Sequence, residues 1–253
     1  PQAVEKYVKT KNFKEVDLVK RDILNLYKSD ILKYGGDDAI KVQSIFEEIP
    51  SQLQKHEKRF TFNALKKEAR FREYKDAFFW LQESMTVNIA YNTTEPNIGL
   101  RLNRESSALK CYLGDTGLLI SLAFDEKGLV DEDIYKKILF DKLSFNEGMI
   151  MENIVAQMLV SSGKKLYFYF NYDKYDKNND MEIDFLIAKD KITSRHNVSP
   201  IEVKSGKNYS FVSLDKFRKK YKEYLYTNYV LHTSDLKVED DIVFLPVYMT
   251  GLL

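Results

Sequence analysis

The chain has 253 residues, of which 44% are hydrophobic and 30% are charged, and its formal net charge is +1. This composition is typical of a globular protein with a core of ordinary size, and it excludes a disordered chain or an overall polycation. No stretch reaches the roughly 18 apolar residues that a membrane-spanning helix needs. We therefore expect no membrane partner and a cytoplasmic protein.

The cysteine, histidine and glycine patterns exclude several kinds of site. The single cysteine, Cys111, rules out an internal disulfide and a thiolate zinc site. The three histidines lack the spacing of metal ligands. No phosphate loop of the G-x-x-x-x-G-K-S/T type is present, so this chain by itself is not expected to bind ATP in that way.

Residues 1–40 are predicted to form a helical segment. Val16, Val19, Ile23 and Leu26 recur at spacings of three and four, which is the period of a helix with one buried face. The pair Gly35-Gly36 ends this run. A second helix is expected over residues 38–49, ended by the proline at position 50.

Residues 41–118 are predicted to form a winged-helix domain. A helix over residues 73–84 precedes two alternating strands, "TVNIAYN" (86–92) and "ALKCYL" (108–113), and helices followed by a two-stranded wing are the plan of this helix-turn-helix variant. Such modules bind DNA or serve as protein spacers. Because the expected recognition helix has more acidic than basic residues, a position poorly suited to phosphate, both uses stay open.

Residues 119–253 are predicted to form one further domain of helices and strands. A helix over residues 144–163 is followed by three strands, "KLYFYF", "EIDFLIA" and "PIEVKS". An amphipathic helix, "SLDKFRKKYKEYL", and the strands "NYVLH" and "DIVFLPVYM" complete the chain. The order α-β-β-β-α-β predicts an α+β or α/β fold.

Charged side chains lie inside two of these strands, where a core strand would be apolar. Alternation puts Glu182 and Asp184 on one face of their strand and Glu202 and Lys204 on one face of the next. If the strands pair with these charges together, the two carboxylates would repel unless a cation lay between them. Carboxylate oxygens suit Mg²⁺ or Mn²⁺, so Asp184 and Glu202 are candidate metal ligands and Lys204 a candidate catalytic lysine for phosphodiester hydrolysis.

Glu152 is expected to complete this site from the preceding helix. It shares an apolar stripe with Met149, Ala156 and Leu159, and an acid there needs a partner, for which a metal ion or Lys204 would serve. The alternative is that these are ordinary charges on the solvent face of an edge strand, joined in a simple ion pair.

Two stretches are locally basic although the chain as a whole is nearly neutral. Residues 51–75 contain eight lysines and arginines against three acids, and residues 201–230 contain seven against three. Such patches can meet the phosphates of nucleic acid, or they can be ordinary solvated helix faces.

The acids and the lysine resemble the site of the PD-(D/E)XK nuclease superfamily, which has the restriction-endonuclease-like fold. This resemblance implies that Asp184 and Glu202 are metal ligands, that Lys204 is the catalytic lysine, and that Glu152 is an accessory acid. It also implies the α-β-β-β-α-β core and DNA as the expected substrate. The sequence departs from the strict motif because Ile183, not proline, precedes Asp184.

A second resemblance covers nearly the whole chain. The stretches "PQAVEKYV", "LKCYLGDTGLL", "GMIMENIVAQML", "EIDFLI", "PIEVKSG" and "FLPVYM" look like the region that follows the ATPase module in a prokaryotic family of AAA-type ATPases. The resemblance implies an N-terminal ATPase module as partner, with ATP bound only there, and "PQAV" looks like the point where that module ends. The alternative functions are an inactive nuclease fold that docks nucleic acid or protein, or a regulatory domain that packs on the ATPase.

Overall fold

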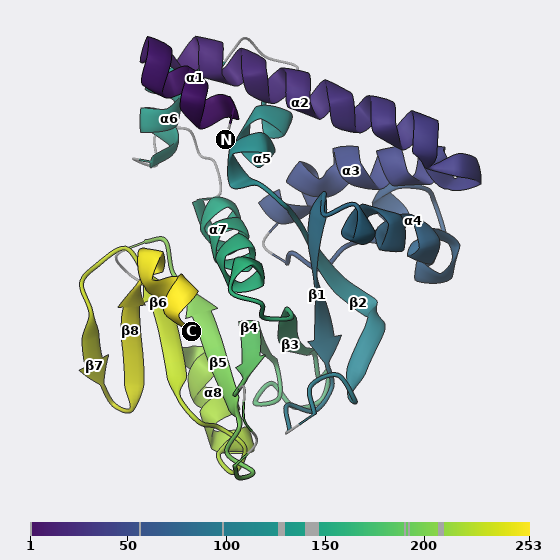
Figure 1. The fold of residues 1–253 in the computed structure, drawn as a ribbon. Coiled ribbons are helices and arrows are strands. Elements are labelled where there is room, and N and C mark those ends of the chain that lie inside the picture. Colours follow the sequence, from purple (N-terminus) through teal and green to yellow (C-terminus); the bar gives the residue numbers. More distant parts are fainter. Residues whose placement is uncertain are drawn as a thin grey trace. The chain divides into compact units, whose positions relative to one another are not determined.

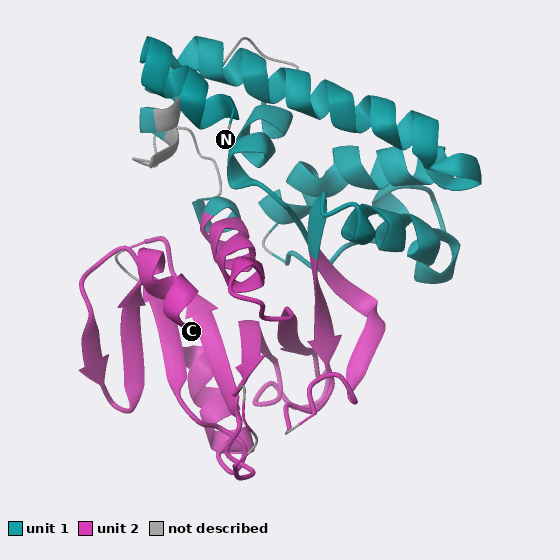
Figure 2. Cartoon of the chain, in the orientation of Figure 1, with its two compact units in different colours: residues 1–88, 111–150 teal, residues 89–110, 151–253 magenta. Residues whose placement is uncertain are grey.

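A computed structural model describes residues 2–55, 57–97, 99–125, 130–139, 147–189, 191, 193–206 and 210–253. The chain divides into two compact units (Figure 2). Unit 1 comprises residues 1–88 and 111–150, and unit 2 comprises residues 89–110 and 151–253. Within the described residues, no helix is both long and apolar enough to span a bilayer.

Unit 1 consists mainly of helices (Figure 1). The segment predicted to be helical over residues 1–40 forms two helices, and Asn12 caps the second by accepting a hydrogen bond from the Lys14 N–H at 3.0 Å. The helices of the unit are α1 (Gln2–Thr10), α2 (Phe13–Tyr34), α3 (Ala39–Gln54), α4 (Phe71–Glu83), α5 (Thr116–Ala123) and α6 (Glu132–Leu139), with the 3-10 turns η1 (Gly36–Asp38) and η2 (Phe62–Ala64).

A buried carboxylate ties the helices of unit 1 together. Asp17 of α2 is fully buried and accepts hydrogen bonds from the Ser121 hydroxyl at 2.6 Å and the Val130 N–H at 2.9 Å. Arg21 and Lys20 lie 2.9 Å and 3.5 Å from the same carboxylate. Burial alone would raise the pKa of Asp17, but these hydrogen bonds and charges outweigh it and hold the pKa below its usual value.

Unit 2 contains most of one mixed sheet of eight strands, in the order β2-β1-β3-β4-β5-β6-β8-β7 (Figure 1). β1 and β3, β5 and β6, and β6 and β8 run parallel, whereas β4 is antiparallel to β3 and β5, and β7 is antiparallel to β8. The strands are β1 (Val87–Thr93), β2 (Arg104–Leu113), β3 (Tyr167–Asn171), β4 (Met181–Ala188), β5 (Val198–Val203), β6 (Asn228–His232), β7 (Lys237–Glu239) and β8 (Ile242–Pro246).

The predicted order of elements from residue 147 to residue 232 is confirmed, and the fold belongs to the mixed α+β class, although α6 and β7 were not predicted. The helices are α7 (Glu147–Ser161) and α8 (Val212–Tyr221), and the chain runs α7-β3-β4-β5-α8-β6. Residues 144–146, which the prediction included in the first helix, lie outside the described residues. The predicted last strand, 241–249, is shorter, because the chain turns into the 3-10 helix η3 (Val247–Leu252) after Pro246.

The two strands predicted to form the wing are present, but they join the larger sheet and do not form a separate wing. β1 pairs with β3 in parallel, with Tyr91 opposite Tyr167. The Asn92 side chain secures this junction, since its Oδ1 accepts the Phe170 N–H at 2.9 Å. The sheet therefore crosses the boundary predicted at residue 118, because the free edge of a two-stranded ribbon is satisfied by pairing with β3.

The hydrophobic core of unit 2 forms where α8 packs on the sheet. Leu214 and Phe217 of α8 lie in one buried cluster with Tyr169, Ile183 and Val230 of three different strands. The Tyr169 hydroxyl also lies 2.8 Å from that of Tyr221 at the end of α8. This packing fixes β4 and β5, the two strands that contain the predicted site residues.

Candidate functional site

The structure brings Asp184 next to the strand that contains Glu202. β4 and β5 are antiparallel with Phe185 opposite Ile201, so Asp184 and Glu202 are each one residue beyond this last recognised pair. The Val203 N–H donates a hydrogen bond to Asp184 Oδ2 at 2.8 Å. The predicted pairing of these two strands is therefore present, and a side-chain bond fixes the Asp184 carboxylate at this point.

A β-bulge in β4 contributes to the position of Asp184. Tyr167 pairs with Leu186, but Tyr169 pairs with Ile183, so β4 has one more residue than β3 in an interval that includes Asp184. Bulges re-aim side chains and recur beside active sites. Strict alternation, the basis of our prediction for this strand, does not hold across the interval.

Lys204 lies directly beside Glu202, as predicted. Its Nζ is 2.5 Å from Glu202 Oε2. Burial alone would lower the pKa of Lys204, but the charges of Glu202 and Asp184 outweigh burial and raise it. Lys204 therefore stays protonated, and Asp184, Glu202 and Lys204 form one interacting group.

A fully buried lysine that the sequence analysis missed lies next to this group. Lys110 of β2 has 0% exposure, and its Nζ lies 2.6 Å from Glu182 Oε1 and 3.8 Å from Asp184 Oδ1. Burial alone would lower the pKa of Lys110, but the charges of Glu182, Glu152 and Asp184 raise it above its ordinary value. A lysine inside the apolar run "ALKCYL" is the same kind of signal that singled out Asp184, so the sequence contained the clue.

Glu152 of α7 joins the group through Lys110. Its side chain is buried, and its Oε2 lies 3.8 Å from Lys110 Nζ. The sequence had suggested a metal ion or Lys204 as the partner of Glu152. The structure places Lys110 beside Glu152, and the charge of Glu152 also acts on Lys204.

These side chains form a partly buried charge cluster with more acids than cations. When every group is ionised, its four carboxylates and two ammonium groups have a formal net charge of −2. All six belong to unit 2. The cluster consists of Lys110, Glu152, Glu182, Asp184, Glu202 and Lys204.

The pKa of the Glu202 carboxyl is raised by its place in this cluster. Glu202 is 4% exposed, and its Oε1 is buried with no hydrogen-bond partner among the described residues. Burial, followed by the charge of Asp184, raises the pKa of Glu202 to about 8. A buried carboxylate oxygen in this state takes up a proton or a cation.

The donor set fits a hard divalent cation that keeps water ligands. Among the residues that the structure describes, no group of three or more His, Cys, Asp and Glu side chains is arranged to enclose a metal ion. Mg²⁺ commonly uses only one or two carboxylates and completes its shell with water and substrate phosphate. The unpartnered oxygen of Glu202, beside Asp184, meets that requirement.

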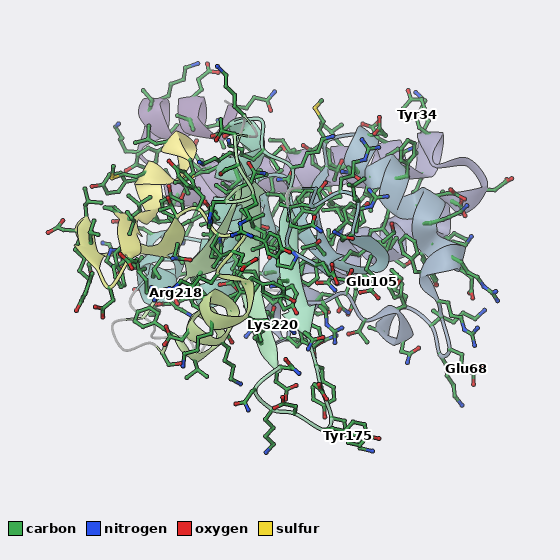
Figure 3. The ribbon with its side chains drawn as sticks, turned by 90° about the horizontal axis from the view of Figure 1, so that it is seen from below. Tyr34, Glu68, Glu105, Tyr175, Arg218 and Lys220 are labelled. Atoms are coloured by element: carbon green, nitrogen blue, oxygen red, sulfur yellow. The ribbon has the colours of Figure 1, made fainter. Side chains whose placement is uncertain are left out.

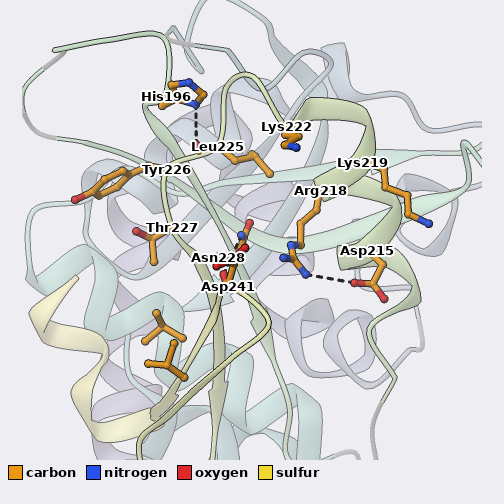
Figure 4. Close-up of a pocket in the computed structure, with 12 residues that line it drawn as sticks. His196, Asp215, Arg218, Lys219, Lys222, Leu225, Tyr226, Thr227, Asn228 and Asp241 are labelled. Atoms are coloured by element: carbon orange, nitrogen blue, oxygen red, sulfur yellow. Dashed lines mark hydrogen bonds and ion pairs between the residues drawn. The ribbon is translucent and has the colours of Figure 1, made fainter.

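Unit 2 also has an open pocket (Figure 4). Its volume is about 780 Å³, and the residues that line it do not include any of the six cluster members. Arg218 in this pocket is 3.6 Å from Asp215 and donates to the Asp240 carbonyl at 2.6 Å. Lys219 and Lys222 also line it, and both lie at the C-terminal end of α8, where basic side chains ordinarily complement the helix dipole.

Much of the basic stretch 201–230 has a structural use. Lys216 donates to the Asp180 carbonyl at 3.0 Å, and Lys220 donates to Asn179 Oδ1 at 3.2 Å, so both hold the loop before β4. Figure 3 labels Lys220 and Arg218, which in the same way holds the turn before β8 through Asp240. These contacts favour the reading of α8 as a structural basic face.

Two protein-family models match the chain. One, described as Domain of unknown function (DUF8612), matches residues 1–128. The other, described as Domain of unknown function (DUF4143), matches residues 147–249 and so includes β4 and β5. No curated protein and no solved structure matches the chain. Neither family description names an activity, so the geometry of the cluster is the guide to function.

Proposed function

The chain belongs to the family described as Domain of unknown function (DUF8612), and we propose that its unit 2 is a divalent-metal-dependent phosphodiesterase that acts on nucleic acid. The unpartnered buried oxygen of Glu202 is the observation that carries this proposal. A structural ion pair needs no unsatisfied acceptor, because leaving one buried costs about 1–3 kcal/mol.

The charge of the cluster supports the same conclusion. One divalent cation would bring its formal net charge from −2 to zero. Asp184 and Glu202 would hold that cation, and its chemistry would be to lower the pKa of a bound water and to neutralise charge on the phosphate. Mg²⁺ or Mn²⁺ matches these oxygen donors.

The position of Lys204 supports a role for it in phosphodiester hydrolysis. Its ammonium group is held 2.5 Å from Glu202 and stays charged, so it can orient a phosphate oxygen and stabilise the negative charge that develops there. Glu152 is buried behind Lys110, so in this proposal it orients the cluster and does not touch substrate. DNA as the substrate, and coupling to an AAA-type ATPase module that binds ATP, rest on the resemblance of the motifs alone.

Cleavage and metal binding test the proposal together. Linear, nicked and branched DNA, and RNA, would be incubated with the protein in Mg²⁺ or Mn²⁺, and Mn²⁺ binding would be measured by calorimetry. We expect Glu202→Gln to lose cleavage and Mn²⁺ binding, and Lys204→Met to lose cleavage by at least about 100-fold while still binding Mn²⁺. Lys222→Ala, outside the cluster, is the matched control. Cleavage that is unchanged in both cluster variants would refute the proposal.

The second candidate is an inactive nuclease fold that docks nucleic acid or protein. Lys110 favours it, because a buried ammonium group already balances part of the acidic charge without any metal ion. This alternative predicts neither Mn²⁺ binding nor cleavage, together with nucleic-acid or protein binding that is insensitive to divalent cations.

A further inference from the structure

Lys110 lies where its ammonium group can act as an internal cation. Its Nζ faces one oxygen of each of three acids, at 2.6 Å from Glu182 and 3.8 Å from both Glu152 and Asp184. It also lies 5.1 Å from the centre of the Phe168 ring. A buried ammonium group is tolerated only with such compensation, so the lysine and these acids depend on one another.

The Asp184 carboxylate is shared between this lysine and the neighbouring strand. Oδ1 is the oxygen nearest Lys110, and Oδ2 accepts the Val203 N–H. In two-metal phosphodiesterases a pair of divalent ions lies about 3.5–4 Å apart. Here the ammonium group of Lys110 lies beside Asp184, Glu152 and Glu182.

We propose that the Lys110 ammonium group takes the place of a second divalent ion, so that unit 2 binds a single metal ion. Lys110 is then a positioning residue: it holds Asp184 for the metal ion beside Glu202 and closes the Glu152 and Glu182 side of the cluster to further cations. This inference deepens the proposed function and rests on it, because it concerns how many ions the same site takes.

Formal charge gives a definite expectation for variants of Lys110. The intact cluster, at −2, is neutralised by one divalent ion. Without the lysine the formal charge of the remaining five side chains is −3, and an oxygen-rich site with this excess of negative charge favours a second divalent ion. Removing a buried lysine that has only a structural role would not change the number of ions bound.

The experiment counts Mn²⁺ ions per chain by calorimetry and by electron paramagnetic resonance, at one pH for all variants. Wild type is expected to bind one ion with an uncoupled spectrum. Lys110→Met is expected to bind a second ion and to show a spin-coupled spectrum. The affinity of Lys110→Met for this second ion should be at least about ten-fold higher than that of wild type. Lys110→Gln, which keeps a polar but uncharged side chain beside Glu182, is a second variant with the same expectation. Lys20→Met is the control, since Lys20 is a buried lysine paired with Asp17 in unit 1.

The outcomes separate the two proposals. No Mn²⁺ bound to wild type would refute the metal site, and this inference with it. Two ions bound to wild type, or one ion bound alike by wild type and by the folded Lys110 variants, would overturn the inference and leave the metal site standing. If neither Lys110 variant folds, the wild-type count and spectrum decide alone, since two coupled ions would overturn the inference and one uncoupled ion would support it.

Discussion

Replacing Glu202 with glutamine tests whether this buried carboxylate holds a proton in the metal-free protein. Its pKa is about 8, compared with 4.5 for an ordinary glutamate. Between these two pH values the folded protein retains a proton that the unfolded chain has released. Raising the pH across this interval therefore lowers the free energy of unfolding, and the stability that the proton contributes is complete only below about pH 4.5.

The size of the effect follows from the pKa difference. At about 1.4 kcal/mol per pKa unit, the change from 4.5 to about 8 sets a ceiling of about 5 kcal/mol on the stability lost over the interval. Glutamine resembles the protonated acid in shape and cannot ionise, so Glu202→Gln removes this pH dependence.

Urea unfolding in a chelator, followed by far-UV circular dichroism from about pH 5 to about pH 9, measures the difference. Hydrogen exchange of peptides from β4 and β5 assigns the change to unit 2. Glu83→Gln, which removes an exposed acid of α4, is the control and should follow wild type. Mn²⁺ should stabilise wild type most at the alkaline end, because it competes with the proton for Glu202. Parallel pH profiles for wild type and Glu202→Gln would refute the reasoning.

Three further outcomes are expected. Asp17→Asn should destabilise unit 1 by about 3–5 kcal/mol, because it removes one partner of a buried ion pair; fluorescence of Trp80, the single tryptophan, reports it during urea unfolding. Since the pKa of Asp17 lies below its ordinary value of 3.8, wild type should lose this contribution as the pH falls through that lowered pKa, and the variant should not. Phe185→Ala should cost about 3–5 kcal/mol by the cavity it leaves, measured by circular dichroism. The double variant Lys219→Ala/Lys222→Ala should keep cleavage within about two-fold of wild type in a nuclease assay, since neither lysine belongs to the cluster.

Local pattern was enough to predict the elements and the strands of the site. The period of apolar residues located α2, α7 and α8, and alternation located β4 and β5. Charged residues inside apolar strands singled out Asp184, Glu202 and Lys204, because a charge is costly in a core strand unless something compensates it. This signal is local and can be read without knowing how the strands pair.

Local pattern failed where another part of the chain decided the outcome. The proline at position 50 was expected to end a helix, but α3 continues to Gln54 through it, since packing of α3 through Ile45, Phe46 and Ile49 outweighs the local penalty. The last predicted strand ends early, at Pro246, because only Ile242–Pro246 pair with β6.

By itself the sequence determined which residues must be compensated: the acids of β4 and β5, Glu152 of α7 and the lysine that follows Glu202 all stand in apolar surroundings that the chain order reveals. Only the tertiary structure decided what compensates them. β2 comes early in the chain, and its membership of the same sheet depends on the pairing of β1 with β3, which joins residues more than seventy positions apart. Because that pairing brings Lys110 among the acids, a second cation supplied by the protein lies beside the carboxylates for which the sequence had suggested a metal ion or Lys204 as the partner.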